Sequence, residues 1–155
     1  MATKSGSLVF YNPAIVHVLS DTINLANSGA NVFKCLLLTN SYTPDLDHEY
    51  ISDLTNELAG NGYGRQSLTG ITLSQTGGTV KWDADNPEFL AVGGALTARY
   101  YVLAHVNLQV DSAAELIGYG LLDDTPGDVV ATAGNKITPI WGEGGIFTGQ
   151  FNDAA

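Results

Sequence analysis

The chain has 155 residues, of which 45% are hydrophobic and only 14% charged, and its formal net charge is −10. A chain of this length can bury a sufficient core as one domain without disulfides or metals. Its six basic residues are scattered along the sequence: Lys4, Lys34, Arg65, Lys81, Arg99 and Lys136. They form no basic face for phosphates, which argues against nucleic acid as a partner. No segment approaches the roughly 18 consecutive apolar residues of a membrane-spanning helix, so no membrane partner is expected either.

The first residues lack a charged region leading into a long apolar segment, so we expect synthesis in a cytoplasm without a secretion signal. Asn12-Pro13 is typical of a helix start. Ile15, Val16, Leu19 and Ile23 then follow at helical spacing. The sequence therefore predicts one amphipathic helix over about 13 to 27, with these four side chains on the core.

The apolar run that starts at Val32 and ends before Asn40 predicts a strand buried on both faces. Cys35, the single cysteine, lies in this run. We expect it to be a small buried hydrophobe, and the count excludes an intramolecular disulfide. The segment from Asp45 to Glu57 is acidic and carries apolar residues at roughly helical spacing, which predicts a solvated turn and a helix start.

The second half of the chain alternates strand and turn signals. Gly60-Asn61-Gly62-Tyr63-Gly64 indicates a loop, and Gly77-Gly78 between two alternating runs predicts a hairpin that ends near Asp83. Further strands are expected over the following ranges: 95–106, 115–122, 129–132, 136–141 and 145–151. Many short strands and one helix predict an all-β fold, mainly an antiparallel β-sandwich or jelly roll, as a single domain over residues 1–155 with one short N-terminal α-helix.

The two ends carry apolar side chains among small or glycine residues. This pattern predicts flexible arms at 1–11 and 142–155 that add a strand or an anchor to a neighbouring subunit. The candidate partner-binding residues are Leu8, Phe10, Tyr11, Ile146, Phe147 and Phe151. The alternative is that the apolar side chains of the C-terminal segment fold back onto their own domain.

No motif predicts catalysis or a cofactor, and the best candidate for a metal site is the acidic segment from Asp45 to Glu57, because hard cations take several oxygen ligands. The acidic segment from Asp45 lacks the glycine and glutamate positions of a calcium-binding loop. His17, His48 and His105 fall in three different predicted elements, and no Gly-x-Ser-x-Gly elbow is present. His105 is expected to be a core histidine with a hydrogen-bonded partner. Gly60-x-Gly62-x-Gly64 lacks the lysine of a phosphate-binding loop.

The aromatic residues allow two interpretations. Trp82, Trp141, Tyr100 and Tyr101 could form a stacking platform for a surface glycan, because aromatic faces suit sugar rings. Core packing is the favoured interpretation, since all four lie inside apolar runs.

A longer series of segments resembles a known family. The segments are Leu37-Leu38-Thr39-Asn40-Ser41-Tyr42-Thr43-Pro44-Asp45, Asp53-Leu54-Thr55-Asn56-Glu57, Gly60-Asn61-Gly62-Tyr63, Leu68-Thr69-Gly70, Val80-Lys81-Trp82-Asp83-Ala84-Asp85, Ala98-Arg99-Tyr100-Tyr101-Val102 and Leu116-Ile117-Gly118-Tyr119. Together they resemble small structural proteins of tailed-bacteriophage virions, often described as head decoration or cement proteins. The resemblance spans most of the chain.

The resemblance implies a non-enzymatic capsid decoration or cement protein on the outside of the virion, made in the host cytoplasm. Its expected partner is the major capsid protein, and a homo-oligomer, either dimer or trimer, is expected on the capsid. No cofactor is implied. There are two alternatives. The chain could be a tail or head–tail junction component, or it could be a module that binds surface glycans.

Overall fold

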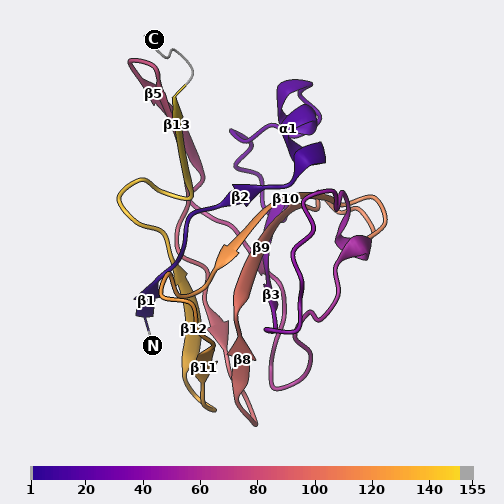
Figure 1. The fold of residues 1–155 in the computed structure, drawn as a ribbon, viewed down its shortest axis with the longest axis vertical. Helices are drawn as coiled ribbons and strands as arrows, with labels where there is room; N and C mark the ends of the chain where they lie inside the picture. The colour runs from indigo at the N-terminus through magenta and orange to yellow at the C-terminus, as the bar shows by residue number, and fades with distance from the viewer. Residues whose placement is uncertain (1, 151–155) are drawn as a thin grey trace.

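The fold is built on a five-stranded antiparallel sheet whose middle strands are buried on both faces. The computed structural model describes residues 2–150. The sheet runs in the order β2 (Val9–Phe10), β10 (Glu115–Leu121), β9 (Tyr100–His105), β3 (Phe33–Leu38) and β4 (Gln66–Ser67). Figure 1 shows β3, β9 and β10 running through the middle of the molecule.

Two hydrophobic clusters occupy the two faces of this sheet. Phe33, Cys35 and Leu37 belong to the larger cluster, whereas Leu36 and Leu38 belong to the smaller one. Because side chains alternate across a strand, one strand contributes to both clusters. The prediction of a strand buried on both faces, with a buried Cys35, is confirmed.

Three smaller sheets complete the described part of the chain, and only one of the strand pairings within it is parallel. The first contains β1 (Ala2–Lys4), parallel to β12 (Lys136–Ile140), and β7 (Phe89–Leu90). The second pairs β8 (Leu96–Ala98) with β11 (Val129–Ala131). The third contains β5 (Thr72–Thr76), β6 (Thr79–Asp83) and β13 (Phe147–Gln150). The predicted all-β fold with one short helix is thus confirmed, whereas the jelly-roll connectivity stays a prediction.

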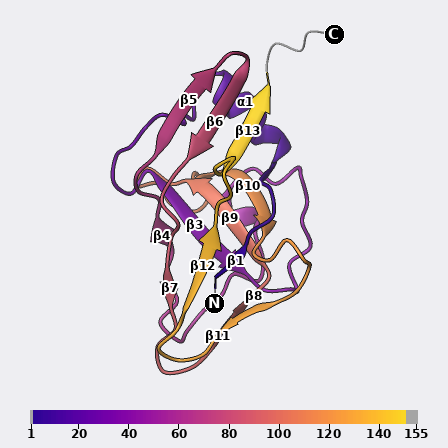
Figure 2. The ribbon, with the colours of Figure 1, turned by 90° about the vertical axis from the view of Figure 1, so that its left-hand side faces the viewer.

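The three-stranded sheet β13-β6-β5 lies at the same end of the molecule as the helix (Figures 1 and 2). Its hairpin β5–β6 turns at Gly77-Gly78, as the sequence predicts. The expected strand over 95–106 is instead two strands, because the chain at Arg99 leaves its pairing with β11 and joins β3 and β10.

The helix is shorter than predicted and exposes a different face. Helix α1 covers Asn12–Leu19, and the chain reverses at Asp21, which has a φ of 62°. Ala14 is buried, whereas Ile15, Val16 and Leu19 are 48%, 65% and 77% exposed. The predicted core face was therefore wrong. Only Ile23 of the four expected side chains is buried, and it lies beyond the helix.

The acidic segment contains one short helix, η1 (Ile51–Asp53), in place of a longer one. Two backbone amides, those of Glu49 and Tyr50, donate to the Asp53 carboxylate at 2.9 Å. These bonds lower the pKa of Asp53 from its usual value. No helix within residues 2–150 is long and apolar enough to cross a membrane.

Trp82 ties the three-stranded sheet to the core, and its substitution is a test of the fold. Its indole nitrogen donates to the Leu25 carbonyl at 2.9 Å, and its side chain is fully buried. Trp82→Phe leaves that buried carbonyl unpaired, so we expect a loss of about 1–3 kcal/mol in urea unfolding. Trp141→Phe is the matched control, because Trp141 is partly exposed and its bond to the Asp85 carbonyl is 3.3 Å long. An equal loss in both variants would contradict this role of Trp82.

Candidate partner-binding surface

An apolar groove of about 410 Å³ separates α1 from the three-stranded sheet. We call it the apolar groove. Its hydrophobic walls are formed by Phe10, Ile15, Val18, Leu19, Ile23, Leu25, Leu73, Val80 and Phe147. Among residues 2–150, Asp21 is the single ionisable residue that lines it. Such a surface suits a protein partner that presents apolar side chains.

The helix forms one wall of the groove because its polar side is already bound elsewhere. His17 Nε2 lies 2.9 Å from Glu49 Oε1, and Val18 packs on the larger core cluster. Ala14, His17 and Val18 thus face the rest of the fold. The opposite side of the helix therefore carries Ile15 and Leu19, which line the groove. Val16 extends the same exposed apolar surface, so the helix offers side chains that the fold itself does not use.

The two predicted arms meet at the groove. The rings of Phe10 and Phe147 lie 4.8 Å apart in an edge-to-face contact, and both residues line the groove. Of the candidate partner-binding residues, these two are partly exposed. Phe151 lies outside the described residues.

The other candidate anchors are part of the core. Leu8, Tyr11 and Ile146 are 8%, 0% and 4% exposed. Tyr11 Oη lies 2.8 Å from Tyr42 Oη, and burial raises the pKa of Tyr11 well above its usual value. These three side chains are not available on the surface of the folded chain, and their role in partner binding stays a prediction.

The described parts of the two arms pair with other strands of the same chain. The N-terminal segment joins β12 through β1 and β10 through β2. Ser5 Oγ donates to the Leu122 carbonyl and accepts from the Ile140 amide, both at 3.1 Å. The C-terminal segment pairs with β6 through β13. The alternative, that apolar side chains of the C-terminal segment fold onto their own domain, holds for Ile146 and Phe147.

A second, more polar cavity lies between these two segments. Its volume is about 670 Å³, and it is lined by residues 4–8 and 140–148. The connection from β12 to β13 carries three glycines there, Gly142, Gly144 and Gly145, and projects from the body of the molecule (Figure 1).

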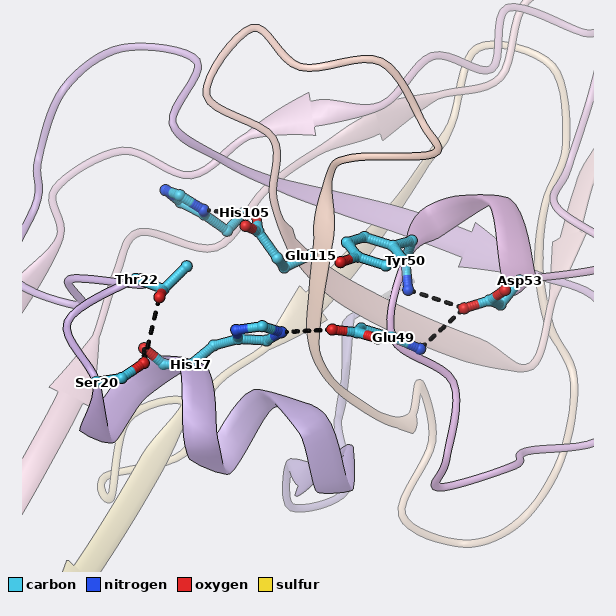
Figure 3. A network of polar contacts seen from close by, with 8 residues as sticks. All are labelled: His17, Ser20, Thr22, Glu49, Tyr50, Asp53, His105 and Glu115. Atoms are coloured by element: carbon cyan, nitrogen blue, oxygen red, sulfur yellow. Dashed lines mark hydrogen bonds and ion pairs between the residues drawn. The ribbon is translucent and has the colours of Figure 1, made fainter.

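The histidines serve a polar network that joins α1, the acidic segment and the central sheet (Figure 3). His105 Nδ1 lies 3.0 Å from Glu115 Oε2, which confirms a core histidine with a hydrogen-bonded partner. His48 Nδ1 lies 3.3 Å from the Tyr42 hydroxyl. Figure 3 shows the side chain of Glu49 directed at His17 and that of Glu115 directed at His105. Within this network, the contact between His17 and Glu49 links α1 to the acidic segment.

Residues 2–150 contain no group of three or more histidines, cysteines or carboxylates placed to hold a metal ion. The carboxylates of the acidic segment have protein partners instead. Asp53 accepts from two backbone amides, Glu57 accepts from Arg65 and Tyr63, and Glu49 faces His17.

The aromatic residues favour core packing over a stacking platform. Trp82 is fully buried, and Tyr101 is fully buried with its hydroxyl donating to the Gly6 carbonyl at 2.9 Å. Trp141 is partly exposed but packs edge-on against Tyr101, at a centroid distance of 5.1 Å. A glycan platform would therefore have to rely on the exposed parts of Trp141 and Tyr100, which is also partly exposed.

The sequence pattern does not identify Ile15 and Leu19, the most exposed apolar residues of the groove. Their helical spacing is as typical of a face that packs on the core as of a face that is exposed. Their exposure follows from the length of the helix, which the structure shows and the spacing alone does not. An eight-residue helix has room for one buried face, and the pair Ala14 and Val18 supplies it.

Searches against protein-family models, curated proteins and solved structures find no match for this chain.

Arg65 and its two carboxylate partners, Glu57 and Asp111, form a cluster that we call the Arg65 clamp, and it contributes to folding stability in a way that depends on acid pH. The guanidinium of Arg65 bridges Glu57 and Asp111, with its shortest bond to each at 2.7 Å. Hydrogen bonding to Arg65 lowers the pKa of Asp111 below its usual value. Because the pKa of Asp111 is lower in the folded state, its ion pair with Arg65 contributes to folding stability above about pH 4. This contribution is lost as the pH falls through the folded-state pKa of Asp111.

We therefore expect Asp111→Asn to lower the melting temperature at pH 7 and to flatten its decline between about pH 4 and pH 2. Asp111 is half exposed, so solvent limits the loss to roughly 1 kcal/mol or less. Asp124→Asn, which removes one exposed carboxylate from the turn after β10, is the control. If both variants show the same decline with pH, the clamp does not act in this way. Thermal melts at a series of pH values measure it.

Proposed function

We propose that this chain is a non-enzymatic structural protein of a tailed-bacteriophage virion, a capsid decoration protein that binds the assembled head from outside. The proposed partner is the major capsid protein, and the proposed effect is to stabilise the head. The resemblance of most of the chain to such proteins supports the family. The single observation on the structure that supports a binding role is the exposed apolar side of α1 at the apolar groove.

The groove combines two properties that a binding surface needs. Its apolar side chains project from a helix and a sheet, so little conformational entropy is lost when a partner covers them. Covering a large apolar side chain that is now exposed contributes up to about 1.5–3 kcal/mol. Leu19 at 77% exposure and Val16 at 65% leave most of that contribution available to a partner.

The charge of the protein sets the orientation of such a complex. With a net charge of −10, most of its surface repels other acidic surfaces, whereas the groove is almost free of charge. A neighbour would therefore be bound through the groove, and the acidic exterior would face solvent. Many copies bound only to the assembled lattice would stabilise that lattice by mass action.

The direct experiment is to mix the purified protein with heads assembled from the major capsid protein of the same virus and to count bound copies. A decoration protein saturates at many copies per head and raises the temperature at which the heads break. Saturation at a handful of copies would instead favour a junction or tail component, and absence from both heads and tails would overturn the proposal.

A pair of polar substitutions tests whether the groove is the contact. Ile15→Gln with Leu19→Gln should weaken binding to heads at least about tenfold, because two apolar side chains no longer gain from burial. Leu108→Gln with Val110→Gln is the matched control, since both are exposed apolar residues, at 86% and 69%, that do not line the groove. Both double variants should keep the unfolding free energy of the free protein within about 1 kcal/mol. Equal binding by the two variants would place the contact elsewhere.

A further inference from the structure

Strand β5 forms an unprotected edge of its sheet. The order β13-β6-β5 leaves its outer side without a paired strand among residues 2–150, and all of its residues, Thr72 to Thr76, are exposed. Figure 2 shows β5 at the margin of the sheet, beside the hairpin turn. An exposed edge of this kind is a template for pairing with another strand.

The backbone groups that face outward can be assigned from one hydrogen bond. The Trp82 carbonyl accepts from the Ile146 amide at 2.9 Å, so the backbone groups of Trp82 face β13 and not β5. Leu73 is the partner of Trp82 in the hairpin, so its own N–H and C=O point to the free edge. Alternation along the strand gives the same orientation to Gln75. Ser74 lies between them and directs its backbone groups to β6.

The edge also lacks the devices that usually prevent pairing. Native edge strands carry charges, prolines or bulges. Residues 66–80 contain no charged residue and no proline, although the chain as a whole has 16 acidic residues. For a protein of net charge −10, this is a stretch on which a second copy can lie without placing like charges opposite one another.

We propose that β5 is a self-pairing edge, on which a second copy of this chain adds its own β5 in antiparallel orientation about a two-fold axis at Ser74. In this register Leu73 lies opposite Gln75 of the second copy. Each of the two Leu73–Gln75 pairs exchanges both of its backbone hydrogen bonds, using the groups that point outward. Ser74 then lies opposite Ser74 as a pair without backbone hydrogen bonds, which matches the inward direction of its own groups.

The side chains agree with the same register. Thr72 lies opposite Thr76 of the second copy, and Ser74 opposite its own equivalent, so one face of the joined strands carries facing hydroxyl groups alone. Cross-strand threonine and serine pairs of this kind stabilise sheets. The other face carries Leu73, which lines the apolar groove, so the two grooves lie on the same side of a continuous six-stranded sheet. This pairing does not depend on the proposed role in a virion.

Cross-linking tests the register directly. In the proposed pair, the two Ser74 Cα atoms lie about 4.5 Å apart, within the range of a disulfide. Ser74→Cys should therefore form a covalent dimer under mild oxidation, read on a non-reducing gel. Thr76→Cys is the matched control on the same strand, because its equivalents are four residues out of register and about 13 Å apart. The native Cys35 is fully buried and adds no background.

We expect Ser74→Cys to cross-link at least about tenfold faster than Thr76→Cys. Equal rates, or no cross-link at Ser74→Cys, would overturn the proposal. Gln75→Pro supplies a second measurement, because it removes an outward N–H and leaves the hydrogen bonds to β6 in place. It should abolish the concentration-dependent dimer in sedimentation without changing the far-ultraviolet circular dichroism. A native chain that stays monomeric at every concentration, with head binding lost in Gln75→Pro, would mean that the edge pairs with a strand of the shell, and would also overturn self-pairing.

Discussion

The whole structure depends on burying both faces of the sheet formed by β3, β9 and β10. An antiparallel sheet commonly leaves one face to solvent, but β3 here alternates apolar side chains into both hydrophobic clusters. Something must therefore cover each face. Short sheets and the loop before β3 cover one face, and α1 with the acidic segment covers the other.

This requirement decides which surfaces remain free for a partner. Helix α1 reaches the central sheet through Ala14 and is held by the bond between His17 and Glu49. Its other apolar side chains cannot also be buried, because a helix of this length packs one face. In the β5–β6 hairpin, β6 is held to the core by Trp82, whose indole nitrogen donates to the Leu25 carbonyl. The other strand, β5, is left as the exposed edge of the sheet. The groove and the edge are thus consequences of how the core is closed.

Local signals made the strands predictable. The apolar run of β3, the Gly77-Gly78 turn and β10 were all expected close to their observed bounds, because burial and turn chemistry are encoded in neighbouring residues. The break at Arg99 was not expected. Its amide donates to the Leu38 carbonyl and its side chain bonds to Asp128, and both partners are remote in sequence.

The candidate surface was only half predictable, because it too depends on contacts between residues that are remote in sequence. Phe10 and Phe147 could be picked out because they are apolar residues in the two terminal segments, where small residues and glycines surround them. Both line the groove. The exposed face of α1 could not, since the spacing of Ile15 and Leu19 fits a core as well as a surface. The buried face is the one that contacts segments far along the chain, through Ala14 and Val18 in the two core clusters and through the bond between His17 and Glu49.

Hydrogen exchange, compared between the free protein and the protein bound to heads, tests whether a partner is bound at the apolar groove, because it reports on each segment separately. We expect added protection at α1 and in the strands that line the apolar groove, with β3 and β9 of the central sheet equally protected in both states. Added protection confined to the opposite end of the molecule, at β8 and β11, would contradict it.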